Sequence, residues 1–335
     1  YNTRLTLSQQ VFNWGRTEKT IELGQRGLDI ANTSIEQTKF ILSYQVVPLY
    51  YGMIFSGEAL KILENNILLY EKKLQIIRIR FSQGLASDLD LSLIEFQINS
   101  IKSQIEDLKN NINKTRIAYN RLANRDNNAD FNPSYRLEYS EYMPDRKTLL
   151  EEAEKNRIEF LQYRQQEELT KTQIEISETG DKPNLNFALN YEFRNGFMPD
   201  MDKIKGNWSA ALSFSYPIFD GFKTKYSVEE GKSNLKILEA KKSDMKHGIF
   251  FEIDQALADI QTIQTKIKIE SDKISHSEKA LKIAEERYSK GLISTTDLIE
   301  AQNNYANSKL NYLQLVYNHT LNKYNIYRLI GKKLF

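Results

Sequence analysis

Two copies of one short motif decide the fold of this chain: RFSQGLASDLDL at residues 80–91 and RYSKGLISTTDL at residues 287–298. Seven of the twelve positions are identical, and the copies lie 207 residues apart. The same offset aligns Leu5 with Leu212, and the alignment continues without a gap as far as Leu122 with Leu329. A register kept over this length indicates an internal tandem duplication, although convergence of two similar helical turns could also produce the motif pair.

Each copy of the motif predicts a turn between two helices. Glycine is the usual residue just after a helix end, because it takes a left-handed conformation without steric cost. A serine followed three residues later by an acidic residue can cap the next helix. The residues concerned are the turn glycines Gly84 and Gly291, the cap serines Ser87 and Ser294, and the acidic residues Asp90 and Asp297. The geometry of the turn explains these residues better than it explains the leucines that follow the glycines, Leu85 and Leu292. We expect these leucines to dock another protein.

Long helices are expected on both sides of each motif. Residues 17–81 and 222–288 read as helices, the first containing Pro48, where we expect a local bend. After each motif, apolar residues recur every seven positions in the a/d pattern of an antiparallel coiled coil. The second of these seams is the more polar one and contains His319, which we interpret as a packing residue and not a metal ligand.

An alternating pattern between the helical regions predicts a β-hairpin. Residues 184–193 and 208–218 alternate with a period of two and are joined by a turn-rich loop. One face is largely aromatic and the other is small and polar. The apolar face carries Leu185, Phe187, Leu189, Tyr191, Trp208, Leu212, Phe214 and Tyr216. A half-buried soluble sheet gives the same alternation, but the strand length suits a tilted bilayer crossing, so we expect this face to contact lipid.

Two further segments complete the division of the chain. By the repeat, residues 1–12 hold the second strand of the first copy, and its partner strand is expected before residue 1. Residues 124–182 have a different composition: a loop-like start is followed by segments 144–166 and 167–177, which read as helices.

The balance of charges and the absence of cysteine narrow the function classes. The chain has 335 residues, with 46 basic and 44 acidic side chains and a formal net charge of +2. The chain therefore lacks the basic excess that binding to nucleic acid would require. With no cysteine, disulfides and cysteine nucleophiles are excluded. No run of 18 apolar residues occurs, which argues against a transmembrane helix. Since we find no catalytic, metal-ligand or phosphate-binding pattern, we expect no enzyme activity, cofactor or metal.

Taken over its whole length, the chain resembles the TolC-like outer-membrane efflux protein family, also called outer membrane factors. The resemblance is carried by the tandem duplication, by the two glycine-leucine motifs, and by two further stretches. These are YPIFDG at residues 216–221 and DLIEAQNNYANSKLNYLQ at residues 297–314. The first copy departs at the strand-to-helix junction, where QVFNWG at residues 10–15 has no proline.

The resemblance implies an α+β membrane protein that is a homotrimer. Residues 1–12 and 183–219 would form a β-barrel in the outer membrane of a Gram-negative bacterium. Residues 13–123 and 220–331 would form a periplasmic tunnel of long antiparallel helical hairpins, with 124–182 as an equatorial segment around it.

The function implied by the resemblance is a passive export duct of a tripartite efflux pump or a type I secretion system. The hairpin tips would dock a periplasmic adaptor protein, which connects the duct indirectly to an inner-membrane transporter. Asp297 and Glu300 fall where the family has an acidic constriction, and Asp90 and Tyr288 where a hydrogen bond holds the mouth shut. Where members can use a basic residue in this lock, the chain has Ile293. The alternative is a soluble coiled-coil scaffold with a small β-domain, which would need no detergent.

Overall fold

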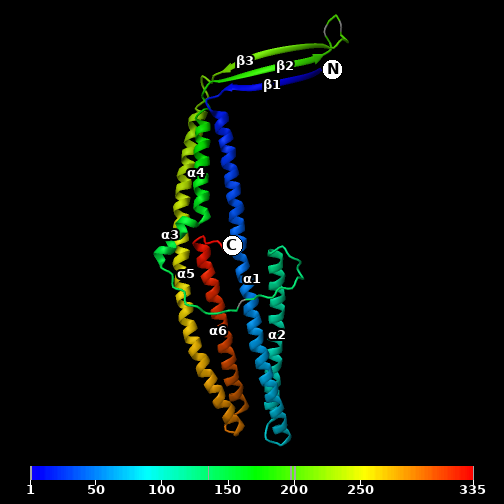
Figure 1. Cartoon of the computed structure of the whole chain (residues 1–335), viewed down its shortest axis with the longest axis vertical. Coiled ribbons are helices and arrows are strands. Elements are labelled where there is room, and N and C mark those ends of the chain that lie inside the picture. The colour runs from blue at the N-terminus through cyan, green and yellow to red at the C-terminus, as the bar shows by residue number, and fades with distance from the viewer. Residues whose placement is uncertain (1, 135, 197, 200, 335) are drawn as a thin grey trace. The chain divides into compact units, whose positions relative to one another are not determined.

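The computed structural model, drawn in Figure 1, describes residues 2–134, 136–196, 198–199 and 201–334. It divides into two units. One unit comprises Tyr1–Gln37 and Ile158–His247, and the other comprises Thr38–Arg157 and Gly248–Phe335. The two longest helices, α1 (Arg16–Ser82) and α5 (Lys223–Ser289), each contribute to both units.

The helices of the two halves of the sequence have matching bounds. Helix α1 is followed by α2 (Asp88–Leu122), and α5 is followed by α6 (Thr295–Leu329). Both α1 and α5 contain 67 residues, and both α2 and α6 contain 35. Every one of these helices begins and ends 207 positions from its counterpart, which is the offset of the doubled motif.

The first unit contains a three-stranded antiparallel sheet of order β1-β2-β3. Its strands are β1 (Asn2–Phe12), β2 (Asn184–Arg194) and β3 (Lys205–Ser215). Residues that pair across strands lie on the same face of the sheet. Tyr191 pairs with Leu5 on one side and Trp208 on the other, whereas Asn190 pairs with Thr6 and Ser209. The register therefore collects the apolar and aromatic side chains on one face and the polar ones on the other.

Strand β3 begins and ends three residues earlier than the sequence pattern predicts. Tyr216, which we expected within the strand, follows its last residue, Ser215. Pro217 has no N–H to donate to a neighbouring strand and restricts the residue before it, so the ladder ends ahead of this pair.

Helix α4 (Ile158–Ser177) packs against the parts of α1 and α5 that belong to the first unit. The side-chain amide of Gln162 donates to Gln37 over 2.8 Å. On the α5 side, a Cβ added at Gly231 would lie 2.5 Å from a side-chain carbon of Ile174. The absence of a side chain at Gly231 therefore lets the two helices approach closely.

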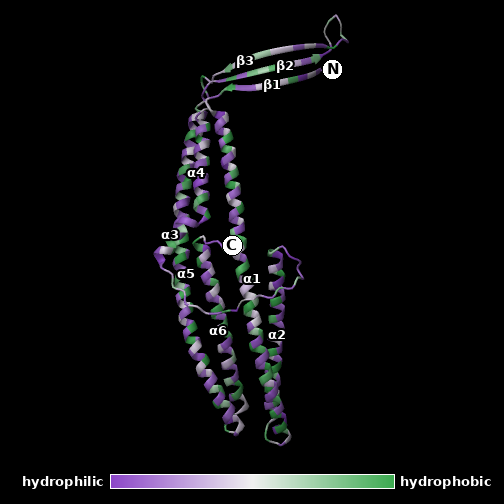
Figure 2. Cartoon of the chain, in the orientation of Figure 1, coloured by the Kyte–Doolittle hydropathy of each residue, from purple (hydrophilic) through white to green (hydrophobic). Residues whose placement is uncertain are grey.

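One apolar cluster of the second unit lies mainly between α1 and α2. Leu63, Tyr70 and Ile77 of α1 lie seven residues apart, as an a/d seam requires. They pack against four buried residues of α2, namely Ile94, Ile98, Ile101 and Ile105, and against Ile299 of α6. Hydrophobic residues are interspersed with hydrophilic ones along all four long helices (Figure 2). The antiparallel hairpin of α1 and α2 predicted from the sequence is present.

The segment between the halves breaks at a different place from the one we predicted. Helix α3 (Arg146–Asn156) ends ten residues before the expected end at 166, and α4 begins at Ile158 and continues through that point. The break is set by contacts within the second unit. The Arg157 guanidinium lies 3.5 Å from the Leu329 carbonyl oxygen, and a Cβ on Gly331 would lie 2.8 Å from the Asn156 backbone.

Helix α1 contains Pro48 and continues past it, as the sequence predicts. One 18-residue window of α1 reaches a mean hydropathy of 1.2, enough by length and composition alone to cross a membrane. This window is not an unbroken run of 18 apolar residues, and the core helix of a soluble protein also meets the hydropathy criterion.

Candidate functional site at the hairpin tips

Both turns between long helices have the same backbone geometry. Gly84 has a φ of 72°, and the next residue, Leu85, donates its N–H to the Arg80 carbonyl oxygen over 2.8 Å. Gly291 also has a φ of 72°, and Leu292 donates to the Arg287 carbonyl over 2.9 Å. This is the Schellman arrangement, in which the residue in the left-handed conformation is glycine.

The leucine beside each turn glycine is exposed to solvent. Leu85 is 72% exposed and Leu292 is 65% exposed. Among the described residues, and apart from the two chain neighbours, no atom lies within 4 Å of a Cβ built on either glycine, so the backbone conformation and not crowding selects glycine there. Each tip thus presents a leucine side chain to solvent from a fixed turn.

Each turn leads into a capped helix, as the sequence predicts. The Ser87 hydroxyl accepts from the Asp90 N–H over 3.2 Å, and the Asp90 carboxylate accepts from the Ser87 N–H over 2.9 Å. Ser294 and Asp297 make the same reciprocal pair over 3.1 and 3.0 Å. These bonds satisfy N–H groups that have no partner within the helix, and they hold the pKa of the Asp297 carboxyl below its ordinary value.

The expected pair of Asp90 and Tyr288 is joined through a third residue. The Thr295 hydroxyl lies 3.2 Å from the Tyr288 hydroxyl, and it also hydrogen-bonds to the Asp90 carboxylate. Burial alone would raise the pKa of Asp90, but the bonds from Thr295 and Ser87 outweigh it and lower that pKa. Thr295 is 4% exposed. No sequence pattern indicated this role of Thr295, because its counterpart in the first half is Asp88.

A cation at this contact comes from the first hairpin. The Arg80 guanidinium lies 3.2 Å from the Ser289 carbonyl oxygen, at the end of α5, and 5.0 Å from the centroid of the Tyr288 ring. Cations are favourable at helix C-termini and over aromatic faces. Ile293, where a basic residue was considered, packs instead against the apolar cluster of Leu281, Ala284 and Leu298.

Asp297 and Glu300 line a separate hollow between α5 and α6. Its volume is about 630 Å³, and its other lining residues are Lys273, His276, Ser277, Ala280, Ala301, Asn304, Asn307, Ser308 and Asn311. The structure does not bring Asp297 into the contact of Asp90 with Thr295. Among the residues described, no group of three or more histidine or carboxylate side chains could hold a metal ion.

A polar network joins the two hairpins at a position along the helices away from the tips. The Gln302 amide of α6 donates to Asn66 of α1 over 2.8 Å and accepts from the Lys73 ammonium over 3.0 Å. The Tyr70 hydroxyl donates to Asn303 over 2.9 Å. Because Lys73 is largely buried, its pKa lies below the ordinary value even though the Glu285 carboxylate is 3.6 Å away. These contacts fix the first hairpin against the second.

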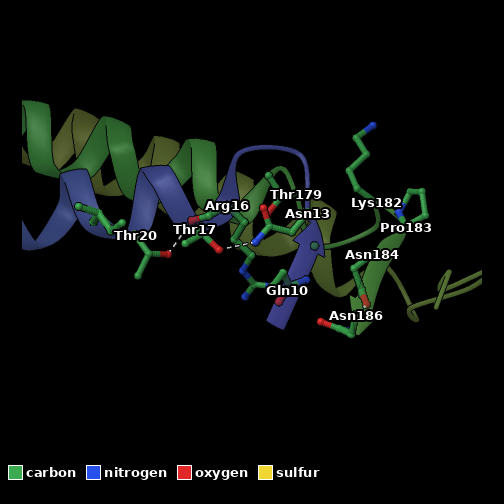
Figure 3. Close-up of a pocket in the computed structure, with 12 residues that line it drawn as sticks. Gln10, Asn13, Arg16, Thr17, Thr20, Thr179, Lys182, Pro183, Asn184 and Asn186 are labelled. Carbon is green, nitrogen blue, oxygen red and sulfur yellow. Dashed lines mark hydrogen bonds between the residues drawn. The ribbon is translucent and has the colours of Figure 1, made fainter. Parts of the chain in front are cut away.

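A second hollow lies where the sheet meets the helices of the first unit. It has a volume of about 500 Å³ and is lined mainly by polar side chains (Figure 3). The Asn13 amide donates to the Thr17 hydroxyl over 2.6 Å near the start of α1. We assign no chemistry to this hollow, because the hydrogen bond between its lining residues Asn13 and Thr17 connects parts of the strand-to-helix junction.

Comparison with known proteins gives consistent matches over nearly the whole chain. The family model described as "Outer membrane efflux protein" matches residues 1–125 and 149–332. The outer membrane protein TolC of Escherichia coli (strain K12) is 20% identical over 344 residues, covering 98% of this chain and 68% of TolC.

Solved structures share the fold. The outer membrane protein VceC of Vibrio cholerae superposes with a TM-score of 0.82 at 15% identity, covering 100% of this chain and 80% of VceC. The CmeC outer membrane channel of Campylobacter jejuni gives 0.81 at 19% identity, covering 99% of this chain and 71% of CmeC.

Proposed function

Because the chain belongs to the outer membrane efflux protein family, we propose a role for each part of it in export. The family membership confirms the resemblance inferred from the sequence. The protein is an efflux channel of the outer membrane of a Gram-negative bacterium. Its relatives are channel proteins, which are not enzymes. The roles of the sheet, the tips and the gate are our proposals.

The sheet is proposed to be one third of a closed barrel in a homotrimer. Strands β1 and β3 are the two edges of the sheet, since β2 lies between them. An open edge cannot persist in lipid, where backbone N–H and C=O groups find no water. Two further copies of the chain, arranged in a closed ring, would pair these edges. The matching helix bounds support an internal duplication as the origin of the repeat.

The apolar face of the sheet is proposed to contact lipid. Trp208, Leu212 and Phe214 are 69%, 66% and 70% exposed, so within one chain nothing covers them. Leu185, Phe187, Leu189 and Tyr191 lie on the same face by register. Tyr216, just beyond β3 and 57% exposed, would lie at the edge of the membrane, where tyrosine is enriched.

The hairpin tips are proposed to dock a periplasmic adaptor protein. The observation that carries this proposal is the repeated presentation of an exposed leucine by a left-handed glycine turn, at Gly84 with Leu85 and at Gly291 with Leu292. A single exposed leucine needs no explanation. An exposed leucine at the same position of two turns with equal geometry fits a binding contact that is repeated at both tips. An inner-membrane transporter would connect through the adaptor and not by direct contact.

The gate is proposed to have two parts. The contact of Asp90, Thr295 and Tyr288 would hold the two hairpins of one chain together at the mouth. Asp297 and Glu300 would form acidic rings in a trimer, since like charges from three chains would lie close together and attract cations.

The test is purification in detergent followed by electrical recording in planar bilayers. We expect a trimer, a stable single-channel conductance, and co-isolation of a periplasmic adaptor after cross-linking in cells. A protein that stays monomeric and soluble without detergent, and that gives no conductance, would instead support the coiled-coil scaffold.

A further inference from the structure

The residues that join the two hairpins of one chain have counterparts in the other half of the sequence that make no such contact within the chain. Within the chain, α1 meets α6 through Asn66 with Gln302 and through Tyr70 with Asn303. The offset of 207 that relates the matching helices assigns each of these residues a counterpart. Asn66 and Gln302 correspond to Lys273 and Glu95, and Tyr70 and Asn303 correspond to Ser277 and Phe96.

These counterparts do not meet within one chain. Lys273 pairs with Glu270 over 3.0 Å on its own helix, and Glu95 pairs with Arg78 over 3.0 Å across the first hairpin. Phe96, near the start of α2, is 65% exposed, although phenylalanine is among the residue types most often buried. Both halves of a second interface are therefore present, on opposite hairpins of the chain.

The sizes of the side chains are exchanged between the two interfaces. In the interface within the chain, the large Tyr70 meets the smaller Asn303. In the second one, the small Ser277 would meet the large Phe96. The receiving side is hollow, because the cluster residues Ile94 and Ile101 are replaced by Ala301 and Ser308. That hollow of about 630 Å³ is lined by Lys273, Ser277, Ala280, Ala301 and Ser308.

The charges are complementary as well. The neutral amide pair of Gln302 and Asn66 corresponds to the carboxylate of Glu95 and the ammonium of Lys273. At the tip, Arg80 reaches the Ser289 carbonyl at the end of α5. Its counterpart, Arg287, is exposed and would reach the corresponding carbonyl of Ser82 at the end of α1.

We propose that the α5–α6 hairpin docks α2 of a second copy of this chain, with Phe96 of one copy seated in the hollow lined by Ser277, Ala280 and Ala301 of the next. Glu95 pairs with Lys273 across this interface. The interface is head-to-tail, so it closes only if successive copies complete a ring. The inference rests on the proposed trimeric channel and assigns the residues by which its helical parts recognise each other.

Cysteine pairs test the contact directly, because these 335 residues include no cysteine. The full-length protein carrying Phe96→Cys and Ser277→Cys is treated in detergent with a short bismaleimide. We expect bands of cross-linked dimer and trimer on a denaturing gel. The matched control combines Phe96→Cys with Lys279→Cys, which lies two residues along α5 and therefore on its opposite face. This control and each single variant should give monomer.

A charge exchange gives a second, independent measurement. Glu95→Lys and Lys273→Glu should each lower the temperature at which the trimer dissociates, and the double exchange should restore much of the loss. Each single change also disturbs a pair within its own chain, so restoration in the double variant is the informative result.

The outcomes separate this inference from the channel proposal. A trimer by light scattering that conducts ions but gives neither the 96–277 cross-link nor restoration would overturn the inference and leave the channel intact. A protein that is monomeric in detergent and does not conduct would overturn both.

Discussion

The hydroxyl of Thr295 lies 3.2 Å from the hydroxyl of Tyr288, and the same threonine bonds to the carboxylate of Asp90 on the other hairpin. Two helices of the second hairpin and one of the first are thus joined at a single buried oxygen. A buried hydroxyl that bridges two side chains is sensitive to removal, because both partners lose a bond together.

Thr295→Ala should favour an open mouth. Losing a hydrogen bond of about 1 kcal/mol changes an equilibrium roughly five-fold. We expect a larger mean single-channel conductance in planar bilayers. Thr296→Ala, at the exposed neighbouring position, is the control and should leave conductance unchanged. Equal conductance of both variants would show that Thr295 does not hold the mouth.

Gly84→Val and Gly291→Val should weaken adaptor coupling. A residue with a Cβ loses about 1–2 kcal/mol in the left-handed conformation, so the turns would rearrange and move Leu85 and Leu292. The measurement is the amount of adaptor cross-linked in cells, together with export activity. Gly248→Val, within α5 where a Cβ meets nothing within 4 Å, is the control. Undiminished cross-linking with both turn glycines replaced would argue against docking at the tips.

Glu300→Gln should weaken block of the channel by divalent cations. Glu300 lines the hollow between α5 and α6 but takes no part in the capping box, so its charge can be removed without disturbing the helix start. Asp297→Asn should add to the effect. Block is measured by titrating a divalent cation during bilayer recording, with Asp107→Asn on α2 as the control. If the blocking concentration does not change, neither carboxylate lies at the constriction.

The contribution of Asp90 to stability should depend on pH. Its folded-state pKa lies below the ordinary value, because hydrogen bonds from Thr295 and Ser87 outweigh burial. The stabilisation is therefore present above the unfolded-state pKa of about 4 and is lost as pH falls through the lower folded-state pKa. We expect Asp90→Asn to lower the melting temperature at pH 7 and to have a smaller effect near pH 3. A difference in melting temperature that is the same at both pH values would contradict this assignment.

The sequence predicted the parts of the tips that depend on neighbouring residues. The left-handed glycines, the capping boxes and the bounds of the long helices follow from residues within a few positions of each other. It did not predict Thr295 or Arg80, because their partners lie on a different hairpin. The break at Arg157 was misplaced for the same reason: it is set by contacts with the end of α6, more than 170 positions away.

The seam of α6 was predicted only in part. Leu298, His319 and Ile326 are buried as the seven-residue pattern indicates. The pattern missed a second buried face that includes Ile299 and Gln302, which point toward the first hairpin. A single periodicity describes a helix with one neighbour, whereas α6 has two.

Two of the bridges between α1 and the second hairpin, from Asn66 to Gln302 and from Arg80 to Ser289, also limit how genes for such chains can change in length. A codon inserted between Asn66 and Arg80 would rotate the Arg80 tip by about 100° around its helix and break one bridge or the other. Heritable gains and losses in this stretch should therefore arrive as compensated pairs, one in each half of the gene. Lineages of different hairpin length would then differ by equal amounts in both halves.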